Sequence, residues 1–203
     1  MRTPFAELEL PEGDRAGPIE RRPNPIAPRA VAEVVRRLDP AARSWVSFTG
    51  GEPLEQVDFL IALAPLLAPR SIHLETAGVN APEMERLRPF VTHVAMDLKL
   101  DSVAKEGDRR GDHRAFLAAC RGVDRSAKAI LGATTDLAEL ESLCALVGAE
   151  DRLIPVILQP ETPASGGFPE LPRMLLDQAY AAAARHVDDV RVIPQTHKFL
   201  RLP

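Results

Sequence analysis

The chain has 203 residues, of which 45% are hydrophobic and 27% are charged, and its formal net charge is −4 at pH 7. This length and composition are typical of one soluble globular domain with a sizeable core. The negative charge and the scattered basic pairs argue against nucleic acid as a partner. No apolar run reaches the roughly 20 residues needed to cross a bilayer, and prolines and acids interrupt the start of the chain. We therefore expect a cytoplasmic protein with no membrane partner.

Residues 1–28 show no clear period and are rich in Pro, Gly and charge, so we interpret them as an irregular arm or loop. A single domain is expected over 29–203, where helical apolar patterns alternate with short β-rich runs. Helices are predicted at Ala30–Leu38, Phe59–Leu67, Pro82–Phe90, His113–Val123, Asp136–Val147 and Leu171–His186. Strands are predicted at Ser44–Thr49, Ser71–Thr76, Thr92–Leu98, Ala127–Leu131, Leu153–Leu158 and Val190–Ile193. Thr134 or Thr135 is expected to cap the helix that begins at residue 136.

Alternating strands and helices predict an α/β fold with a parallel sheet, either a doubly wound open sheet or a barrel. Strands such as 154–158 are apolar at every position, as expected for parallel strands buried on both faces. Polar residues follow most strands, at 49–52, 75–76, 97–99, 159 and 195–198. Strand ends that contribute jointly to one face are typical of a (β/α) barrel, whereas a doubly wound sheet gathers its ligand groups at one switch point. We favour the barrel.

The turn Thr49-Gly50-Gly51-Glu52-Pro53 is the most informative stretch. Two glycines let the backbone approach a ligand closely and adopt positive φ, and the carboxylate after them can accept hydrogen bonds from a ligand ammonium group. A tight strand-to-helix turn with a capping acid explains the same residues without any ligand. Both interpretations stand on this turn alone.

In context, this turn resembles the second strand and turn of radical S-adenosylmethionine (SAM) enzymes, in which it binds the amino group of the cofactor. Three further segments are similar to the 7-carboxy-7-deazaguanine synthase family and extend the resemblance over about 24–203. They are Leu74-Glu75-Thr76-Ala77-Gly78, Met96-Asp97-Leu98-Lys99, and Pro155-Val156-Ile157-Leu158-Gln159-Pro160 followed by Arg191-Val192-Ile193-Pro194-Gln195-Thr196-His197-Lys198. The resemblance implies an incomplete (β/α) barrel with its site at the carboxyl ends of the strands.

The resemblance also implies a lyase reaction. Such enzymes cleave SAM with a [4Fe–4S] cluster, and the resulting radical starts an Mg²⁺-assisted ring contraction of 6-carboxy-5,6,7,8-tetrahydropterin that leads to queuosine and other deazapurines. Gly50, Gly51 and Glu52 would then contact the cofactor. Further cofactor-binding residues would be Thr76, Asp97, Lys99 and Gln159, and substrate-binding residues Thr49, Gln195, His197, Lys198 and Pro203. The expected partner is a pterin-like small molecule, and a homodimer is kept as an additional expectation.

The three closely spaced cysteines that hold the cluster in this family are not in the sequence. Cys120 and Cys144 are the only two cysteines, and each falls inside a helical pattern, where we expect a buried thiol and no disulfide. No metal ligand is therefore predicted in the chain. We expect either an amino-terminally truncated and inactive synthase core or a protein that naturally lacks the cluster. The rival functions are a nucleoside- or pterin-binding regulatory barrel and a radical SAM enzyme of another subfamily.

Overall fold

The structure is a computed structural model that describes residues 5–9, 19–163 and 171–196. Its strands are β1 (Phe5–Glu9), β2 (Ile19–Pro23), β3 (Val46–Phe48), β4 (Ile72–Thr76), β5 (His93–Leu98), β6 (Asp124–Leu131), β7 (Val156–Pro160) and β8 (Val190–Val192). Its α-helices are α1 (Pro28–Leu38), α2 (Val57–Leu63), α3 (Ala81–Leu87), α4 (Asp101–Ala104), α5 (Arg110–Ala119), α6 (Leu137–Glu150) and α7 (Arg173–Ala184). Three 3₁₀ helices complete the described elements: η1 (Pro53–Gln56), η2 (Ala64–Leu67) and η3 (Arg88–Phe90). Within these residues no helix is long and apolar enough to cross a membrane.

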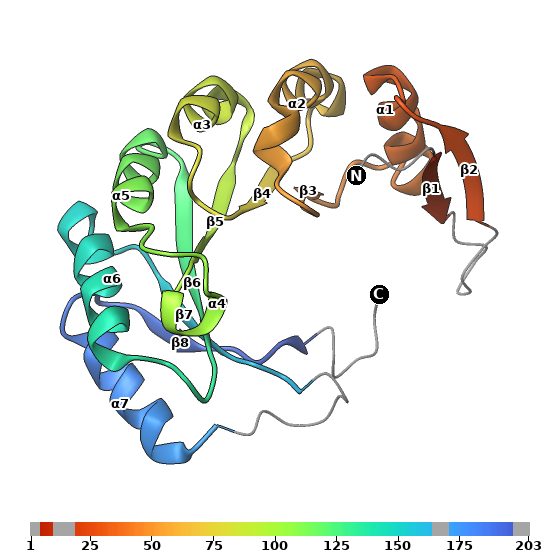
Figure 1. Ribbon diagram of the computed structural model, residues 1–203. Helices are drawn as coiled ribbons and strands as arrows, with labels where there is room; N and C mark the ends of the chain where they lie inside the picture. The colour runs from red at the N-terminus through yellow and green to blue at the C-terminus, as the bar shows by residue number, and fades with distance from the viewer. Residues whose placement is uncertain (1–4, 10–18, 164–170, 197–203) are drawn as a thin grey trace.

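The main sheet is parallel, and its strand order β3-β4-β5-β6-β7-β8 follows the order of the chain. The predicted α/β fold with helices between parallel strands is therefore confirmed. A doubly wound sheet would reverse its strand order at a switch point, and these six strands have no such reversal. Figure 1 shows α2, α3, α5, α6 and α7 along one side of a curved sheet. We call the helix-covered side the outer face and the opposite side the inner face.

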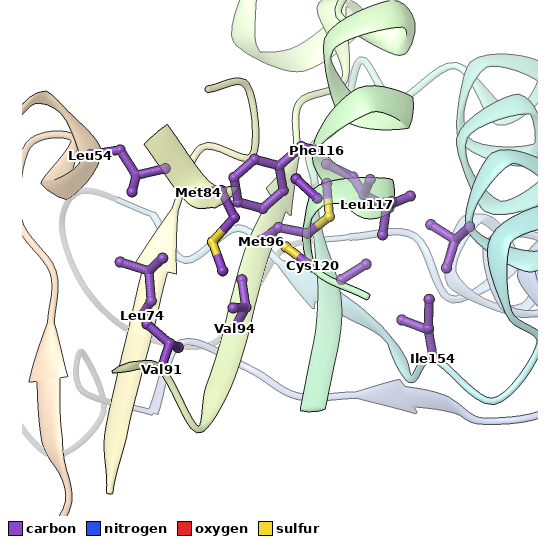
Figure 2. Close-up of a cluster of buried hydrophobic side chains, with 14 of the residues drawn as sticks. Leu54, Leu74, Met84, Val91, Val94, Met96, Phe116, Leu117, Cys120 and Ile154 are labelled. Atoms are coloured by element: carbon purple, nitrogen blue, oxygen red, sulfur yellow. The ribbon is translucent and has the colours of Figure 1, made fainter. Parts of the chain in front are cut away.

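Apolar side chains fill the space between the outer face and the helices. Leu74, Val94 and Met96 from the strands meet Met84 of α3 and Phe116 of α5, as Figure 2 shows. All five side chains are at most 2% exposed, so this layer excludes water. Burial of apolar area on this scale is the dominant stabilising contribution to a fold of this size.

Prolines account for two differences between predicted and observed helices. The largest shift is in α5, Arg110–Ala119 against the predicted His113–Val123, and α4 was not predicted. The pattern predicted one helix over Phe59–Leu67, but α2 ends at Leu63 and the chain continues as η2, in which Pro65 occupies the first turn. Pro89 has the same effect after α3, which gives way to η3. Proline has no N–H to donate and its ring crowds the preceding turn. The α-helix therefore ends just before the 3₁₀ turn that contains the proline.

Two local predictions need correction. Strands β1 and β2 pair in antiparallel register inside the segment 1–28, for which an irregular arm or loop was predicted. The N-cap of α6 is Asp136, whose carboxylate accepts from the backbone N–H groups of Ala138 and Glu139. Thr135 instead accepts from the N–H of Gly132, so its hydroxyl stabilises the preceding turn. Asp competes well with Thr as a cap, and the choice depends on where the helix starts.

Candidate functional site

The carboxyl ends of the parallel strands lie together at one end of the sheet, which we call the carboxyl edge. The glycine turn after β3 forms part of it. Gly50 and Gly51 have φ of +87° and +58°, a region that side-chain-bearing residues rarely adopt. No heavy atom lies within 4 Å of a Cβ built on either glycine. The turn therefore needs glycine for its backbone shape, and the space beside it is open to a ligand.

Glu52 links this turn to the end of β4. Its Oε1 accepts from Thr76 Oγ1 at 2.8 Å and from the N–H of Leu54 at 3.1 Å, and its Oε2 accepts from the N–H of Ala77 at 2.8 Å. The capping interpretation of Glu52 is thus correct, because the carboxylate is also the N-cap of η1. A carboxylate has about four acceptor positions, so these three bonds leave room for one more donor.

Thr76 lies at the end of β4 and is 6% exposed. Its hydroxyl donates to Glu52 and accepts from the N–H of Gly78 at 3.2 Å. Thr76 and Glu52, both predicted as cofactor-binding residues, are therefore in direct contact. The hydroxyl proton is already committed to Glu52, so Thr76 shapes the turn that a ligand would meet.

Asp97 is shared by two lysines on the inner face. Its carboxylate lies 3.4 Å from Lys99 Nζ and 3.0 Å from Lys128 Nζ. Lys128 stands directly opposite Asp97 in the parallel register of β5 and β6. Asp97 and Lys99 thus form a local ion pair, and the group as a whole carries one excess positive charge. Such a group suits a ligand carboxylate.

Inner-face side chains of β4 to β8 line a cavity of about 1030 Å³. The strand residues that line it are His73, Glu75, His93, Ala95, Asp124, Arg125, Ser126, Lys128, Ile157, Gln159 and Arg191, and the segments just before β6 and β7 supply the rest. Gln159, a predicted cofactor-binding residue, is thus placed in this cavity on β7. Volumes of this order accommodate small-molecule ligands.

Two histidines pack against each other at the amino-terminal end of this cavity. The rings of His73 and His93 have centroids 5.3 Å apart, and each ring hydrogen-bonds a serine hydroxyl, Ser47 for His73 and Ser126 for His93. Burial, followed by repulsion from His73, lowers the pKa of His93 below its usual value. This pair lies beneath the carboxyl edge and was not among the predicted site residues.

The predicted substrate-binding residues are only partly described. Thr49 Oγ1 donates to Glu75 Oε2 at 3.3 Å, so Thr49 joins the inner-face group through a carboxylate that sequence reasoning did not select. Gln195 Oε1 accepts from the N–H of Thr162 at 2.9 Å, which ties the segment after β8 to the loop after β7. His197, Lys198 and Pro203 lie outside the described residues.

Sequence reasoning also missed Lys128, although a signal was available. The run Ala127–Leu131 was predicted as a strand, and Lys128 is its one charged residue, next to apolar neighbours. A lysine in a central parallel strand needs a partner or a polar cavity. Lys128 has both, because it contacts Asp97 and lines the inner cavity.

The cysteines do not form a cluster site. Cys120 is 1% exposed at the end of α5 and Cys144 is 0% exposed within α6, and burial raises the pKa of each thiol to about 12. A [4Fe–4S] cluster needs closely spaced thiolates, and two protonated, separately buried thiols cannot provide them. Across 5–9, 19–163 and 171–196, no group of three or more His, Cys, Asp or Glu side chains could hold a metal ion. The residues present thus do not fit the cluster.

No protein-family model matches the chain. A protein of Geobacter sulfurreducens named 7-carboxy-7-deazaguanine synthase is 33% identical over 181 residues, which cover 87% of this chain and 72% of that protein. A protein of Thermococcus kodakarensis with the same name is 30% identical over 196 residues, 92% of this chain and 74% of that protein. One of Methanothermobacter thermautotrophicus, also so named, is 28% identical over 192 residues. The chain belongs to the 7-carboxy-7-deazaguanine synthase family.

Proposed function

We propose that this chain is the ligand-binding core of a 7-carboxy-7-deazaguanine synthase, which binds SAM at the carboxyl edge of its sheet and a carboxylated pterin in the inner cavity beside it. The observation that carries the proposal is the open glycine turn at Gly50 and Gly51, with the Glu52 carboxylate fixed next to it. The reaction served would be the ring contraction of 6-carboxy-5,6,7,8-tetrahydropterin in deazapurine synthesis.

The sheet is proposed to be an incomplete (β/α) barrel of the radical SAM type. Three features support this: the strand order follows the chain, all ladders are parallel, and α2, α3, α5, α6 and α7 lie on the outer side of a curved sheet (Figure 1). In barrels of this kind the ligands bind where the strands end at their carboxyl termini. The polar groups after β3, β4 and β5 lie at that edge.

The cofactor's methionyl ammonium is assigned to the glycine turn and Glu52. The free acceptor position on the Glu52 carboxylate would take one ammonium N–H in a charge-assisted hydrogen bond. The two glycines allow the ligand to approach the backbone, since a Cβ there would occupy the open space. Thr76, Asp97, Lys99 and Gln159 remain proposed contacts for the rest of the cofactor.

The pterin is assigned to the inner cavity. Its carboxylate would pair with the excess positive charge that Lys99 and Lys128 place around Asp97. Thr49 and Gln195 offer a hydroxyl and an amide for the donors and acceptors of the pterin edge. His197, Lys198 and Pro203 belong to the same proposed substrate set on the family resemblance alone.

The residues of this chain do not fit the cluster, so its proposed role stops at ligand binding and includes no radical step. We expect the 203-residue protein to bind SAM without producing 5′-deoxyadenosine, even after anaerobic treatment with iron, sulfide and a reductant. Formation of 5′-deoxyadenosine by the purified chain would contradict the conclusion that its residues do not fit the cluster. The same lack of three closely spaced thiolates favours a second candidate, a cluster-free protein that holds a nucleoside or pterin for regulation.

Equilibrium dialysis with radiolabelled SAM tests the binding proposal directly. The decisive variants are Gly50→Ala and Gly122→Ala, because both glycines have nearly the same φ, +87° and +86°, and neither has an atom near an added Cβ. Gly122 precedes β6, at the amino-terminal ends of the strands, where it lines the far part of the inner cavity and not the glycine turn. Both substitutions should destabilise the fold by roughly 1–2 kcal/mol. Only Gly50→Ala should weaken SAM binding, by about tenfold or more.

Three outcomes of this dialysis would decide against the proposed edge. They are no measurable SAM binding by the wild-type chain, equal loss of affinity in both variants, and full affinity in Gly50→Ala. Binding of a carboxylated pterin without SAM would favour the cluster-free regulatory alternative.

A further inference from the structure

His113 is buried beneath the loops that carry the proposed cofactor edge. It lies on α5, on the outer side of the sheet, and has 0% exposure. Its Nδ1 lies 2.9 Å from the carbonyl oxygen of Gly78, and its Nε2 accepts from the backbone N–H of Lys99 at 3.3 Å. One imidazole therefore bridges the segment after β4 and the segment after β5.

These two partners fix the protonation state of the ring. The carbonyl of Gly78 can only accept, so Nδ1 must carry the proton; the N–H of Lys99 can only donate, so Nε2 must be free. Burial lowers the pKa of His113 and keeps the ring neutral. The neutral Nδ1–H tautomer makes both bonds, and a second proton on Nε2 would remove the bond to Lys99.

The bridge continues a hydrogen-bonded series that starts at the glycine turn. Glu52 accepts from Thr76 and Ala77, and the N–H of Gly78 donates to Thr76 Oγ1. His113 then joins the carbonyl of Gly78 to the backbone of Lys99. The series thus connects the ends of β3, β4 and β5 without a break.

Close packing leaves the loop after β4 little freedom on the side of β5. Gly78 has φ of +67°, and a Cβ added to it would lie 2.8 Å from Met96 Cε. The loop therefore rests on β5 as bare backbone, and His113 contacts its carbonyl from the outer side. Loss of the imidazole would alter the separation of the two loops, because Gly78 has no side chain that could replace the contact with His113.

We propose that His113 is a positioning residue that holds the loop after β4 and the backbone of Lys99 in the register in which the carboxyl edge binds SAM. The inference rests on the proposed function, which identifies SAM as the ligand of this edge. The geometry of the bridge itself stands independently. His113 touches neither cofactor nor substrate and acts through Gly78 and Lys99.

The test compares three variants by SAM dialysis at pH 7.5. His113→Leu keeps an apolar side chain in the core but removes both hydrogen bonds, and should weaken SAM binding by about tenfold. His113→Gln supplies one amide donor and one carbonyl acceptor and should recover most of this loss. Leu117→Ala is the control, because Leu117 lies one turn further along the same face of α5 and is 1% exposed. It should lower the melting temperature at least as much as His113→Leu and leave SAM affinity unchanged.

Two ligand-free measurements separate this inference from the proposed function. Nitrogen-15 NMR of the wild-type ring should show a protonated Nδ1 and an unprotonated Nε2, and amide exchange at Lys99 should be faster in His113→Leu than in Leu117→Ala. If the wild-type chain fails to bind SAM while both results hold, the proposed function fails and the bridge remains. The inference is overturned if the ring has the other tautomer, if Lys99 exchanges equally fast in both variants, or if His113→Leu binds SAM as the wild-type chain does.

Discussion

The two faces of the main sheet have opposite chemistry, although they belong to the same strands. On β4, Leu74 is 0% exposed on the outer face, whereas its neighbours His73 and Glu75 line the inner cavity. Strand β5 repeats the pattern with buried Val94 and Met96 beside His93 and Asp97, and β7 alternates in the same way. The outer face stabilises the fold and the inner face offers ionisable groups to a ligand. Substitutions should therefore separate into two classes according to face.

Thiol reactivity should show the largest difference between the faces. Cys120 and Cys144 lie on the helix side, where burial raises their pKa to about 12. Only the thiolate reacts with iodoacetamide, so at pH 8 both should react about three orders of magnitude more slowly than in urea-unfolded chain. An Ala95→Cys thiol on the inner face should react at an ordinary rate. Rapid labelling of the native cysteines would break the distinction.

Truncation in the outer layer should have the next largest effect. Phe116→Ala removes a fully buried ring that packs between α5 and the sheet, and should lower the free energy of unfolding by about 3–5 kcal/mol. Gln159→Ala, on the inner face of β7, should lower it by less than about 1 kcal/mol. Urea denaturation measures both. Equal losses would mean that the inner face contributes to stability as much as the core does.

Thr76 sharpens the comparison, because it is buried on the outer side but bonded to Glu52 at the carboxyl edge. Thr76→Val keeps the shape and removes the hydroxyl, so it should destabilise the fold by about 1–2 kcal/mol and also weaken SAM binding. Thr92 is the control at the opposite end of the same strand pair, because its hydroxyl also accepts a backbone hydrogen bond, from the N–H of Ile72, although Thr92 is exposed. Thr92→Val should reduce stability alone. Weaker SAM binding by Thr92→Val in dialysis would contradict a binding role specific to the carboxyl edge.

Local patterns predicted most of the fold. Apolar spacing and glycine or proline punctuation placed each strand of the main sheet within a few residues, because these signals depend on neighbours in sequence. The hairpin of β1 and β2 was missed because charged residues such as Glu20, Arg21 and Arg22 hide the strand pattern. The burial of the inner face was also predicted wrongly. The all-apolar run around 154–158 suggested burial on both sides, but Ile157 lines the inner cavity.

The site residues chosen from the sequence are those at the carboxyl ends of strands and in the segments that resemble the family. Gly50, Gly51 and Glu52 were chosen from their order in the chain, and the positive φ values of Gly50 and Gly51 explain why glycine is needed at those two positions. Lys128 and His113 were missed because their roles depend on contacts between residues far apart in sequence. Lys128 is 31 positions from Asp97, and His113 is 35 from Gly78. The lone charge of Lys128 in an apolar strand signals a partner, but a single sequence does not say which distant residue that partner is.

The smallest predicted effect is the pH dependence of stability, which compares a histidine on each face. Burial is the first cause that lowers the pKa of both His113, behind the sheet, and His93, in the inner cavity. The charged or titratable groups that shift these pKa values are Lys99, Arg109 and Asp112 for His113, and His73 and Asp124 for His93. Because both pKa values lie below the ordinary 6.5, the unfolded chain binds more protons under acid conditions. Stability should therefore be complete above about pH 6.5 and fall as the pH drops below it.

Each histidine can steepen that fall by at most about 1.4 kcal/mol per pH unit. Urea denaturation between pH 5 and 8 should give a flatter profile for His113→Gln than for His93→Gln. His113 is fully enclosed, while His93 borders a cavity and already hydrogen-bonds Ser126. If the profile of His93→Gln is flatter than that of His113→Gln, the larger burial penalty lies on the inner face. The division into a stabilising face and a ligand face would then be wrong for the two histidines.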